Sequence, residues 1–278
     1  MKKKRISIVR ILLTVLFWMI GFSMLMPLLW MISSSFKVEA DVFTFPIQWI
    51  PPRFHAVENY KEVWGRHYNF GLYYWNSIRL TIAATALQMF VSALGAYGFS
   101  KINWKGRDKV FLLYLATMMI PPQVTIVSQF LIAKQIGLYN THRGMILIYM
   151  FSVYGVFLLR QSMLGIPDSL SESAKIDGAG HFRIFMQIIF PLTKPALATL
   201  GILKFVWTWN DYQMPLVFLS DRKLYTIQLG MRQFASEAGN YYSLIMAAAV
   251  SSIIPLIIAF LFGQRFVIDG IATGAVKG

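Results

Sequence analysis

The segment that decides the fold runs from residue 244 to residue 262 and reads LIMAAAVSSIIPLIIAFLF. It holds no charged side chain and is almost wholly apolar. A helix needs about 20 such residues to cross the hydrocarbon core of a bilayer, so this segment predicts a membrane span. Five other stretches are similarly long and mostly apolar. The predicted spans are residues 9–32, 78–99, 110–133, 145–163, 195–219 and 244–262.

The composition agrees with a membrane protein. Of the 278 residues, 56% are hydrophobic and 14% are charged, and the mean hydropathy is +0.55. Soluble domains carry about 25% charged residues. The chain has no cysteine, which excludes disulfides, thiolate catalysis and cysteine-ligated metals. The formal charge of +14 lies beside the apolar runs instead of forming a basic stripe, so it indicates membrane orientation and not nucleic-acid binding.

The positive charges also orient the spans. With the N-terminus inside, the inner segments hold 15 lysines and arginines and the outer segments hold 9. Because inner loops are enriched in these residues, we expect an all-α membrane protein of six transmembrane helices with both termini in the cytoplasm. The expected layout is a cytoplasmic N-terminus (1–8), a transmembrane domain (9–265) and a cytoplasmic tail (266–278). Two long loops, an outer one at 33–75 and an inner one at 164–191, are expected to be functional.

The inner loop predicts two short helices. Ser169 and Glu172 have the spacing of a capping box, and Gly178 suits a helix exit, which predicts a first helix at residues 170–177. A second helix should follow and end at Pro191. Its apolar stripe consists of Phe182, Phe185, Met186 and Ile189. Two interpretations stay open: these helices cap the protein's own inner face, or they offer a surface to another protein.

A spaced signature lies in the same loop. Glu172-Ser173-Ala174 is followed after three residues by Gly178, and nine residues later by Ile188-Ile189-Phe190-Pro191. This resembles the cytoplasmic signature of bacterial ATP-binding-cassette importer permeases: Glu-Ala-Ala, three residues, Gly, nine residues, Ile-x-Leu-Pro. The chain departs from this signature at two positions. Ser173 replaces the first alanine and is similarly small, and Phe190 replaces the leucine and is also apolar.

Further motifs extend the resemblance over most of the chain to the carbohydrate-uptake branch, specifically to its shorter, six-span, maltose-type permease subunit. They are Trp49-Ile50-Pro51-Pro52, Glu58-Asn59-Tyr60, Asn76-Ser77, Trp209-Asn210-Asp211-Tyr212 with Pro215-Leu216, and Gly270 to Gly278. The resemblance implies a multi-pass protein of the bacterial cytoplasmic membrane that imports sugars or oligosaccharides. Importers of glycerol phosphate or another small polar solute share this machinery and stay as an alternative.

The resemblance also implies partners and coupling residues. The expected partners are a second permease subunit in a heterodimer, two ATPase subunits, an extracytoplasmic solute-binding protein and membrane lipid. The resemblance implies that the first inner-loop helix is a coupling helix that docks on an ATPase subunit. Its expected coupling residues are Glu172, Ser173, Ala174, Asp177, Gly178, Ile188 and Pro191.

The chain is not expected to be an enzyme. It has no Gly-x-x-x-x-Gly-Lys-Ser/Thr run to hold a nucleotide phosphate, so no cofactor is expected on this chain, and ATP and Mg should bind the partner subunits. No catalytic residue and no metal site are predicted, because the four histidines are scattered on loops. The tail invites two interpretations: an unstructured end, or an ATPase contact through Gly274, Val276 and Lys277.

Polar residues within spans mark a candidate translocation pathway, because they are costly in lipid. The fifth predicted span contains Lys204, Trp209, Asn210 and Asp211. Lys204 and Asp211 are two helical turns apart on one face, so they pair with each other, hold neighbouring helices, or line a cavity. On the outer side, Gly239 and Asn240 are candidate contacts for the solute-binding protein.

Pro121-Pro122 should break or kink the third span, because proline lacks a backbone donor and clashes with the preceding turn. Nearby polar side chains could satisfy the freed carbonyls, or the break could serve as a gating hinge. An ion-coupled secondary transporter is a rival function. It would need internal repeats and membrane acids, and Asp211 is the one acid well inside a predicted span.

Overall fold

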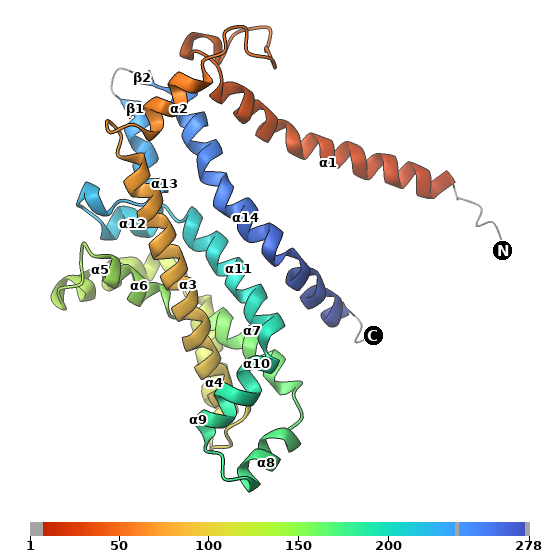
Figure 1. Cartoon of the computed structure of the whole chain (residues 1–278). Coiled ribbons are helices and arrows are strands. Elements are labelled where there is room, and N and C mark those ends of the chain that lie inside the picture. Colours follow the sequence, from red (N-terminus) through yellow and green to blue (C-terminus); the bar gives the residue numbers. More distant parts are fainter. Residues whose placement is uncertain (1–7, 237–238, 276–278) are drawn as a thin grey trace. The chain divides into compact units, whose positions relative to one another are not determined.

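The computed structural model describes residues 8–236 and 239–275, and this part of the chain is almost wholly helical. The chain divides into two compact units. One comprises residues 1–71 and 231–254, and the other comprises residues 72–230 and 255–278. Helix α14, Tyr242–Ala275, contributes to both units (Figure 1).

The first unit contains the N-terminal helix and the outer loop. Its elements are α1 (Ile8–Ser35), η1 (Glu39–Asp41), α2 (Ala56–Trp64), η5 (Met231–Phe234), β1 (Ala235–Ser236), β2 (Gly239–Asn240) and the first part of α14. The two short strands pair antiparallel, with Ala235 opposite Asn240. The predicted all-α class therefore holds apart from this two-residue pair.

Side-chain bonds order the outer loop within this unit. The Glu39 carboxylate accepts hydrogen bonds from the backbone N–H groups of Tyr242 and Ser243 at 2.9 and 2.8 Å, and so caps the start of α14. Arg53 donates twice to Asp41, at 2.7 and 2.9 Å. This hydrogen bond to Arg53 holds the pKa of the Asp41 carboxyl below its usual range.

The second unit contains the remaining helices. These are α3 (Phe70–Ser100), α4 (Arg107–Ala116), η2 (Thr117–Met119), α5 (Pro122–Gln135), α6 (His142–Tyr149), α7 (Val153–Leu164), α8 (Ser169–Ile176), α9 (His181–Ile184), the π turn η3 (Phe185–Ile189), α10 (Phe190–Leu192), α11 (Lys194–Asn210), α12 (Gln213–Phe218), η4 (Arg222–Leu224), α13 (Ile227–Gly230) and the second part of α14. The first two residues of α3 belong to the other unit.

Three helices in the described residues are long and apolar enough to cross a membrane by themselves: Ile8–Ser35, Phe70–Ser100 and Tyr242–Gln264. Three helix pairs meet the same length and composition test together but are bent at a short break. The bends are 99° between Arg107–Met119 and Pro122–Gln135, 45° between His142–Tyr149 and Val153–Leu164, and 77° between His181–Leu192 and Lys194–Asn210. Counting each bent pair as one span gives six.

Three predicted spans are not continuous helices, because the fourth is interrupted between Tyr149 and Val153 and the third and fifth break as follows. The third breaks at Pro121, whose backbone is extended, as the proline pair predicted. The Thr125 hydroxyl satisfies one nearby acceptor by donating to the Pro122 carbonyl at 3.0 Å. The fifth span was predicted to continue to residue 219, which is wrong. Helix α11 ends at Asn210 because Asp211 takes an extended conformation, and the separate helix α12 follows.

The inner-loop helices match the prediction except at their ends. Helix α8 covers residues 169–176 and exits through Gly178, which has a positive φ of 79°. The predicted capping box is wrong, because Asp168 is the N-cap residue and its backbone carbonyl accepts from Ser171 and Glu172. The predicted stop at Pro191 is also wrong. The helix widens into the π turn and continues through Pro191 to Leu192.

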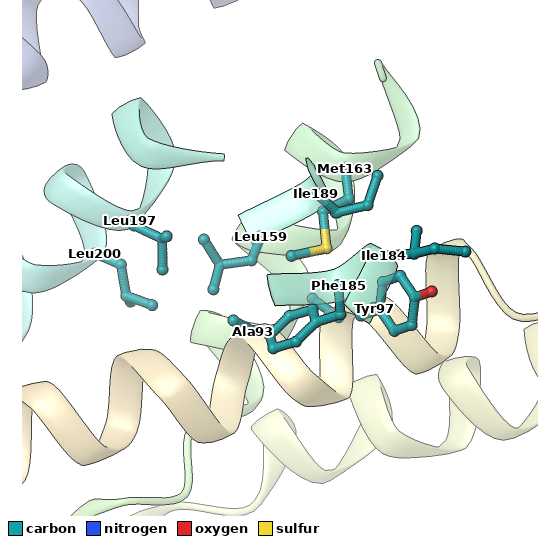
Figure 2. Packing of buried hydrophobic residues seen from close by; sticks show 10 residues of the cluster. Ala93, Tyr97, Leu159, Met163, Ile184, Phe185, Ile189, Leu197 and Leu200 are labelled. Atoms are coloured by element: carbon teal, nitrogen blue, oxygen red, sulfur yellow. The ribbon is translucent and has the colours of Figure 1, made fainter. Parts of the chain in front are cut away.

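A buried cluster holds together the end of the second unit from which α8 extends (Figure 2). It gathers side chains from α3, α7, the segment 181–192 and α11. Its labelled members are Ala93, Tyr97, Leu159, Met163, Ile184, Phe185, Ile189, Leu197 and Leu200. Tight apolar burial of this kind fixes the loop that follows α7 against the end of α3.

Candidate functional site

Most residues of helix α8 are exposed. It lies beyond the end of α3 in the second unit, on the side where α9 and α10 also lie (Figure 1). Leu170 is 43% and Ile176 87% exposed, although both are large apolar side chains. Exposed apolar residues on a short helix are typical of a protein contact.

The signature residues divide into an exposed and a packed group. Glu172, Ser173, Asp177 and Gly178 are exposed. Ala174 and Ile188 instead pack against the buried cluster, and Pro191 is half-buried. The first group is available to a partner, whereas the second group holds α8 and the following helix on the rest of the unit.

An ion pair fixes the start of α8. The Lys101 amino group donates to the Asp168 carboxylate and to the Ile166 carbonyl, both at 2.6 Å. The Lys101 side chain is 3% exposed, whereas that of Asp168 is 76% exposed. The hydrogen bond from Lys101 lowers the pKa of Asp168 below its ordinary value, so the carboxylate is charged at neutral pH.

A second basic side chain joins the neighbouring segments. The Arg160 guanidinium donates to the Phe99 carbonyl at 3.0 Å and to Asp108 at 2.9 Å, and it lies over the Phe111 ring at 4.1 Å. Helices α3, α4 and α7 are thereby linked next to α8. The sequence placed Lys101 and Arg160 among inner-side charges but carried no signal for these long-range contacts.

A cavity with both apolar and polar lining residues lies elsewhere in the same unit, beside the end of α11. Its volume is about 280 Å³, and Lys204, Trp207, Asp211 and Tyr149 are among its lining residues. Gln123, Gln129 and Gln213 line it as well. The Tyr149 hydroxyl donates to Asp211 at 2.7 Å, and the Lys204 amino group lies 4.6 Å from the centre of the Tyr149 ring. Tyr149 thus connects the two charged residues that the sequence placed on one helix face.

The other two pathway candidates do not line this cavity. Trp209 is buried, stacks on Phe205 with ring centres 6.1 Å apart and meets the Tyr74 ring edge-on. The Asn210 amide donates to the Val206 carbonyl of its own helix at 2.9 Å. The sequence missed Tyr149 and the glutamines, because they come from α5, α6 and α12.

The remaining candidates have less structural detail. Gly239 and Asn240 form β2. Gly274 lies within α14, whereas Val276 and Lys277 lie outside the described residues. Within the described ranges, no group of three or more metal-ligating side chains could hold a metal ion.

Comparison with known proteins identifies the family. Residues 88–272 match the family described as the binding-protein-dependent transport system inner membrane component. The chain belongs to that family. It is therefore an inner membrane component of a transport system, and the resemblance inferred from the inner-loop signature is confirmed.

Relatives of this transport component are permease subunits of similar length. The arabinooligosaccharides transport system permease protein AraQ of Bacillus subtilis (strain 168) is 33% identical, over 98% of this chain and 97% of its own length. The melibiose/raffinose/stachyose import permease protein MelC of the same organism is 33% identical over the whole of both chains. The sn-glycerol-3-phosphate transport system permease protein UgpE of Yersinia pestis bv. Antiqua (strain Antiqua) is 32% identical over 84% of this chain and 85% of its own.

A solved structure shares the fold of this transport component. It belongs to a bacterial ABC transporter involved in the import of the acidic polysaccharide alginate. It matches with a TM-score of 0.83 over 95% of this chain and 99% of the other, at 24% identity.

Proposed function

We propose that this transport component is the sugar-importing permease subunit of an ATP-driven, binding-protein-dependent importer, with α8 as its coupling helix. The observation that carries the proposal is the exposure of α8, which presents Leu170, Ile176 and the signature residues Glu172 and Ser173 to solvent. The permease relatives that transport arabinooligosaccharides or melibiose, raffinose and stachyose support the cargo class.

In this proposal the three single helices and the three bent pairs form six spans. The excess of lysine and arginine on the inner segments supports a cytoplasmic location for both termini and for α8. Residues 1–8 and 266–278 are then the cytoplasmic ends of a transmembrane domain at 9–265, and this domain sits in the bacterial cytoplasmic membrane.

The energy for transport comes from partner chains. Two ATPase subunits bind ATP and Mg, and one of them receives α8 and the tail residues Gly274, Val276 and Lys277. A second permease subunit completes the pathway. A solute-binding protein delivers cargo on the outer side, where Gly239 and Asn240 lie in the β1–β2 pair. Nucleotide binding to the ATPase pair biases the spans between inward-open and outward-open states.

The cavity around Lys204 is the part of this chain that we assign to the pathway. The Trp207 ring, the three glutamine amides and the Asp211 carboxylate offer an apolar face and hydrogen-bonding groups to a sugar ligand. Glycerol phosphate is the second candidate cargo, because a glycerol-phosphate permease is among the relatives and Lys204 supplies a cation.

Charge reversal at Glu172 tests the proposal. In a complex co-purified from the native membrane, Glu172→Lys should leave the ATPase subunits bound but reduce cargo uptake at least tenfold. Lys109→Glu, at an exposed residue outside α8, is the control and should keep uptake. Unimpaired uptake by Glu172→Lys, or a native complex without an ATPase subunit, would contradict the proposal.

The cargo is decided by competition. Cells that carry the native complex would import a labelled oligosaccharide in the presence of excess unlabelled arabino-oligosaccharide, raffinose or glycerol 3-phosphate. We expect a saccharide to compete. Competition by glycerol 3-phosphate alone would favour the second candidate.

A further inference from the structure

The inner end of α3 contacts the loop that carries α8 at both places where this loop meets the second unit. At the departing side, Lys101 follows the last residue of α3 and bonds Ile166 and Asp168 directly before α8. At the returning side, the Tyr97 hydroxyl lies 3.3 Å from His181 Nδ1 at the start of α9. The loop is therefore fastened to one turn of α3 on either side of α8.

The Lys101 side chain is held in a buried position by two short hydrogen bonds. A lysine is rarely buried without partners, because its ammonium group must keep its hydrogen bonds. Lys101 is almost fully buried and reaches one carbonyl and one carboxylate at short distance. The Ile166 carbonyl would hold the amino group even if Asp168 moved, and Asp168 adds the direct link to the N-cap of α8.

The returning side is held by packing. The Phe185 ring lies 5.3 Å from the Tyr97 ring, centre to centre, and Phe185 is fully buried in the cluster (Figure 2). Helix α8 itself has few attachments of its own. Ser171 and Ala174 are its residues that are not exposed, and the Ser171 hydroxyl has no hydrogen-bond partner in the described part of the chain. A displacement of α8 can therefore reach the rest of the unit through its two ends and through the packing of Ala174 against the buried cluster.

The opposite end of α3 is also fixed. The Asn76 amide donates to the carbonyls of Lys223 and Tyr225 at 2.8 and 3.1 Å, and the Ser77 hydroxyl accepts from Ile227 N–H at 2.7 Å. Helix α3 has 31 residues, or roughly 46 Å at 1.5 Å per residue. A single rigid helix thus joins the loop of α8 to the segment 223–227.

We propose that Lys101 is a positioning residue that transmits displacement of α8 to α3, and through α3 to residues 223–227. The inference rests on the proposed function, in which an ATPase subunit moves α8. It adds the route that the movement takes through this chain. Removing the Lys101 amino group should let α8 move while α3 stays in place.

The test measures movement of α3 in the intact complex in lipid nanodiscs. Because this chain has no cysteine, cysteines introduced at the exposed residues Ile82 on α3 and Leu203 on α11 can carry spin labels. ATP with vanadate should shift the distance between these labels in the otherwise unchanged complex. Lys101→Met should lose most of that shift while the ATPase subunits stay bound. Lys101→Arg should restore it, and Lys105→Met, at an exposed neighbour, should leave it unchanged.

A shift in Lys101→Met as large as in the unchanged complex would overturn the proposal. If Lys101→Met prevents assembly, Asp168→Ala tests the same contact by changing an exposed side chain. A smaller nucleotide-dependent shift of the label distance in Asp168→Ala supports the proposal, and an unaltered shift overturns it. Failure of the proposed function looks different. In that case the complex with native Lys101 contains no ATPase subunit or shows no nucleotide-dependent shift. The proposed route through α3 is then overturned as well.

Discussion

At the residue scale, this protein places its membrane charges in contact with aromatic rings. Lys204 lies over the rings of Tyr149 and Trp207, and Asp211 accepts from the Tyr149 hydroxyl. Contact with an aromatic face stabilises a desolvated cation, and a hydroxyl donor stabilises a desolvated carboxylate. Tyr149 therefore stabilises both charged groups, Lys204 through its ring and Asp211 through its hydroxyl.

Tyr149→Phe should lower the melting temperature of the purified protein, equivalent to a loss of about 1–3 kcal/mol, because the Asp211 carboxylate loses the shorter of its two hydrogen bonds and keeps the one from the Met214 N–H. Tyr154→Phe is the matched control, since Tyr154 is 43% exposed, and it should change the melting temperature little. Equal melting temperatures for Tyr149→Phe and the unchanged protein would show that the hydrogen bond is unimportant.

Asp41 should make the outer loop sensitive to acid. Its pKa is lowered by the hydrogen bond from Arg53, so the stabilisation is complete above the ordinary carboxyl pKa and is lost as the pH falls through the lowered value. The melting-temperature difference between the unchanged protein and Arg53→Gln should stay constant from pH 8 to about pH 5 and shrink toward pH 3. A difference that grows on acidification would contradict this sign.

At the scale of elements, the segment between α8 and α11 is held by one face of a helix. Phe185 and Ile189 are buried, whereas Phe182 is 66% exposed, although the sequence placed all three on one stripe. Phe185→Ala should therefore cost about 3–5 kcal/mol of unfolding free energy, the usual cost of removing a buried phenylalanine. Phe182→Ala is the control and should cost far less. Denaturant titration of both variants measures the difference, and similar losses would refute it.

The exit of α8 depends on one glycine. Gly178 has a φ of 79°, a conformation that costs an alanine roughly 1–2 kcal/mol, although a Cβ atom there would meet open space. Gly178→Ala should therefore lower stability by this amount through the backbone alone. Gly180→Ala, where a Cβ atom would also meet open space and φ is −72°, should be neutral. Equal melting temperatures for the two variants would contradict the argument.

The sequence predicted those features that depend on local chemistry. Glycine at 178 and the proline pair at 121–122 each limit the backbone of their own neighbourhood, and the structure has a helix exit and a break there. It could not predict where Pro191 lies in its helix, because a π turn leaves no residue pattern. Nor could it find the bond from Lys101 to Asp168, which joins residues 67 positions apart.

At the scale of the whole molecule, two thirds of the six proposed spans follow from hydropathy with little adjustment, since three are continuous helices and the fourth bends by 45°. The other two contain sharp breaks that hydropathy does not register. Helix α1 is continuous, and its apolar membrane-length window has no residue buried within the chain. It must be covered by lipid or by another subunit.

The proposed orientation has a direct test, because the chain lacks cysteine. Single cysteines at Lys105 and Lys175 should react with a membrane-impermeant maleimide only after the cells are opened. Cysteines at Lys61 and Arg222 should react in intact spheroplasts. All four positions are exposed, so accessibility within the chain does not limit the reaction. Labelling of Lys175→Cys from outside would place α8 on the wrong side of the membrane for an ATPase contact.

The wide turn at Phe185–Ile189 also determines which length changes the inner loop can accept. A π turn holds one more residue than the α-helical turn it replaces. Deleting Gln187, which is exposed, would convert it to ordinary helix and leave the segments on either side in the same rotational register, because the wide turn already absorbs the extra residue. A homologue with one residue fewer here can therefore keep the same face of its inner-loop helix by forming an ordinary α-helical turn in this place.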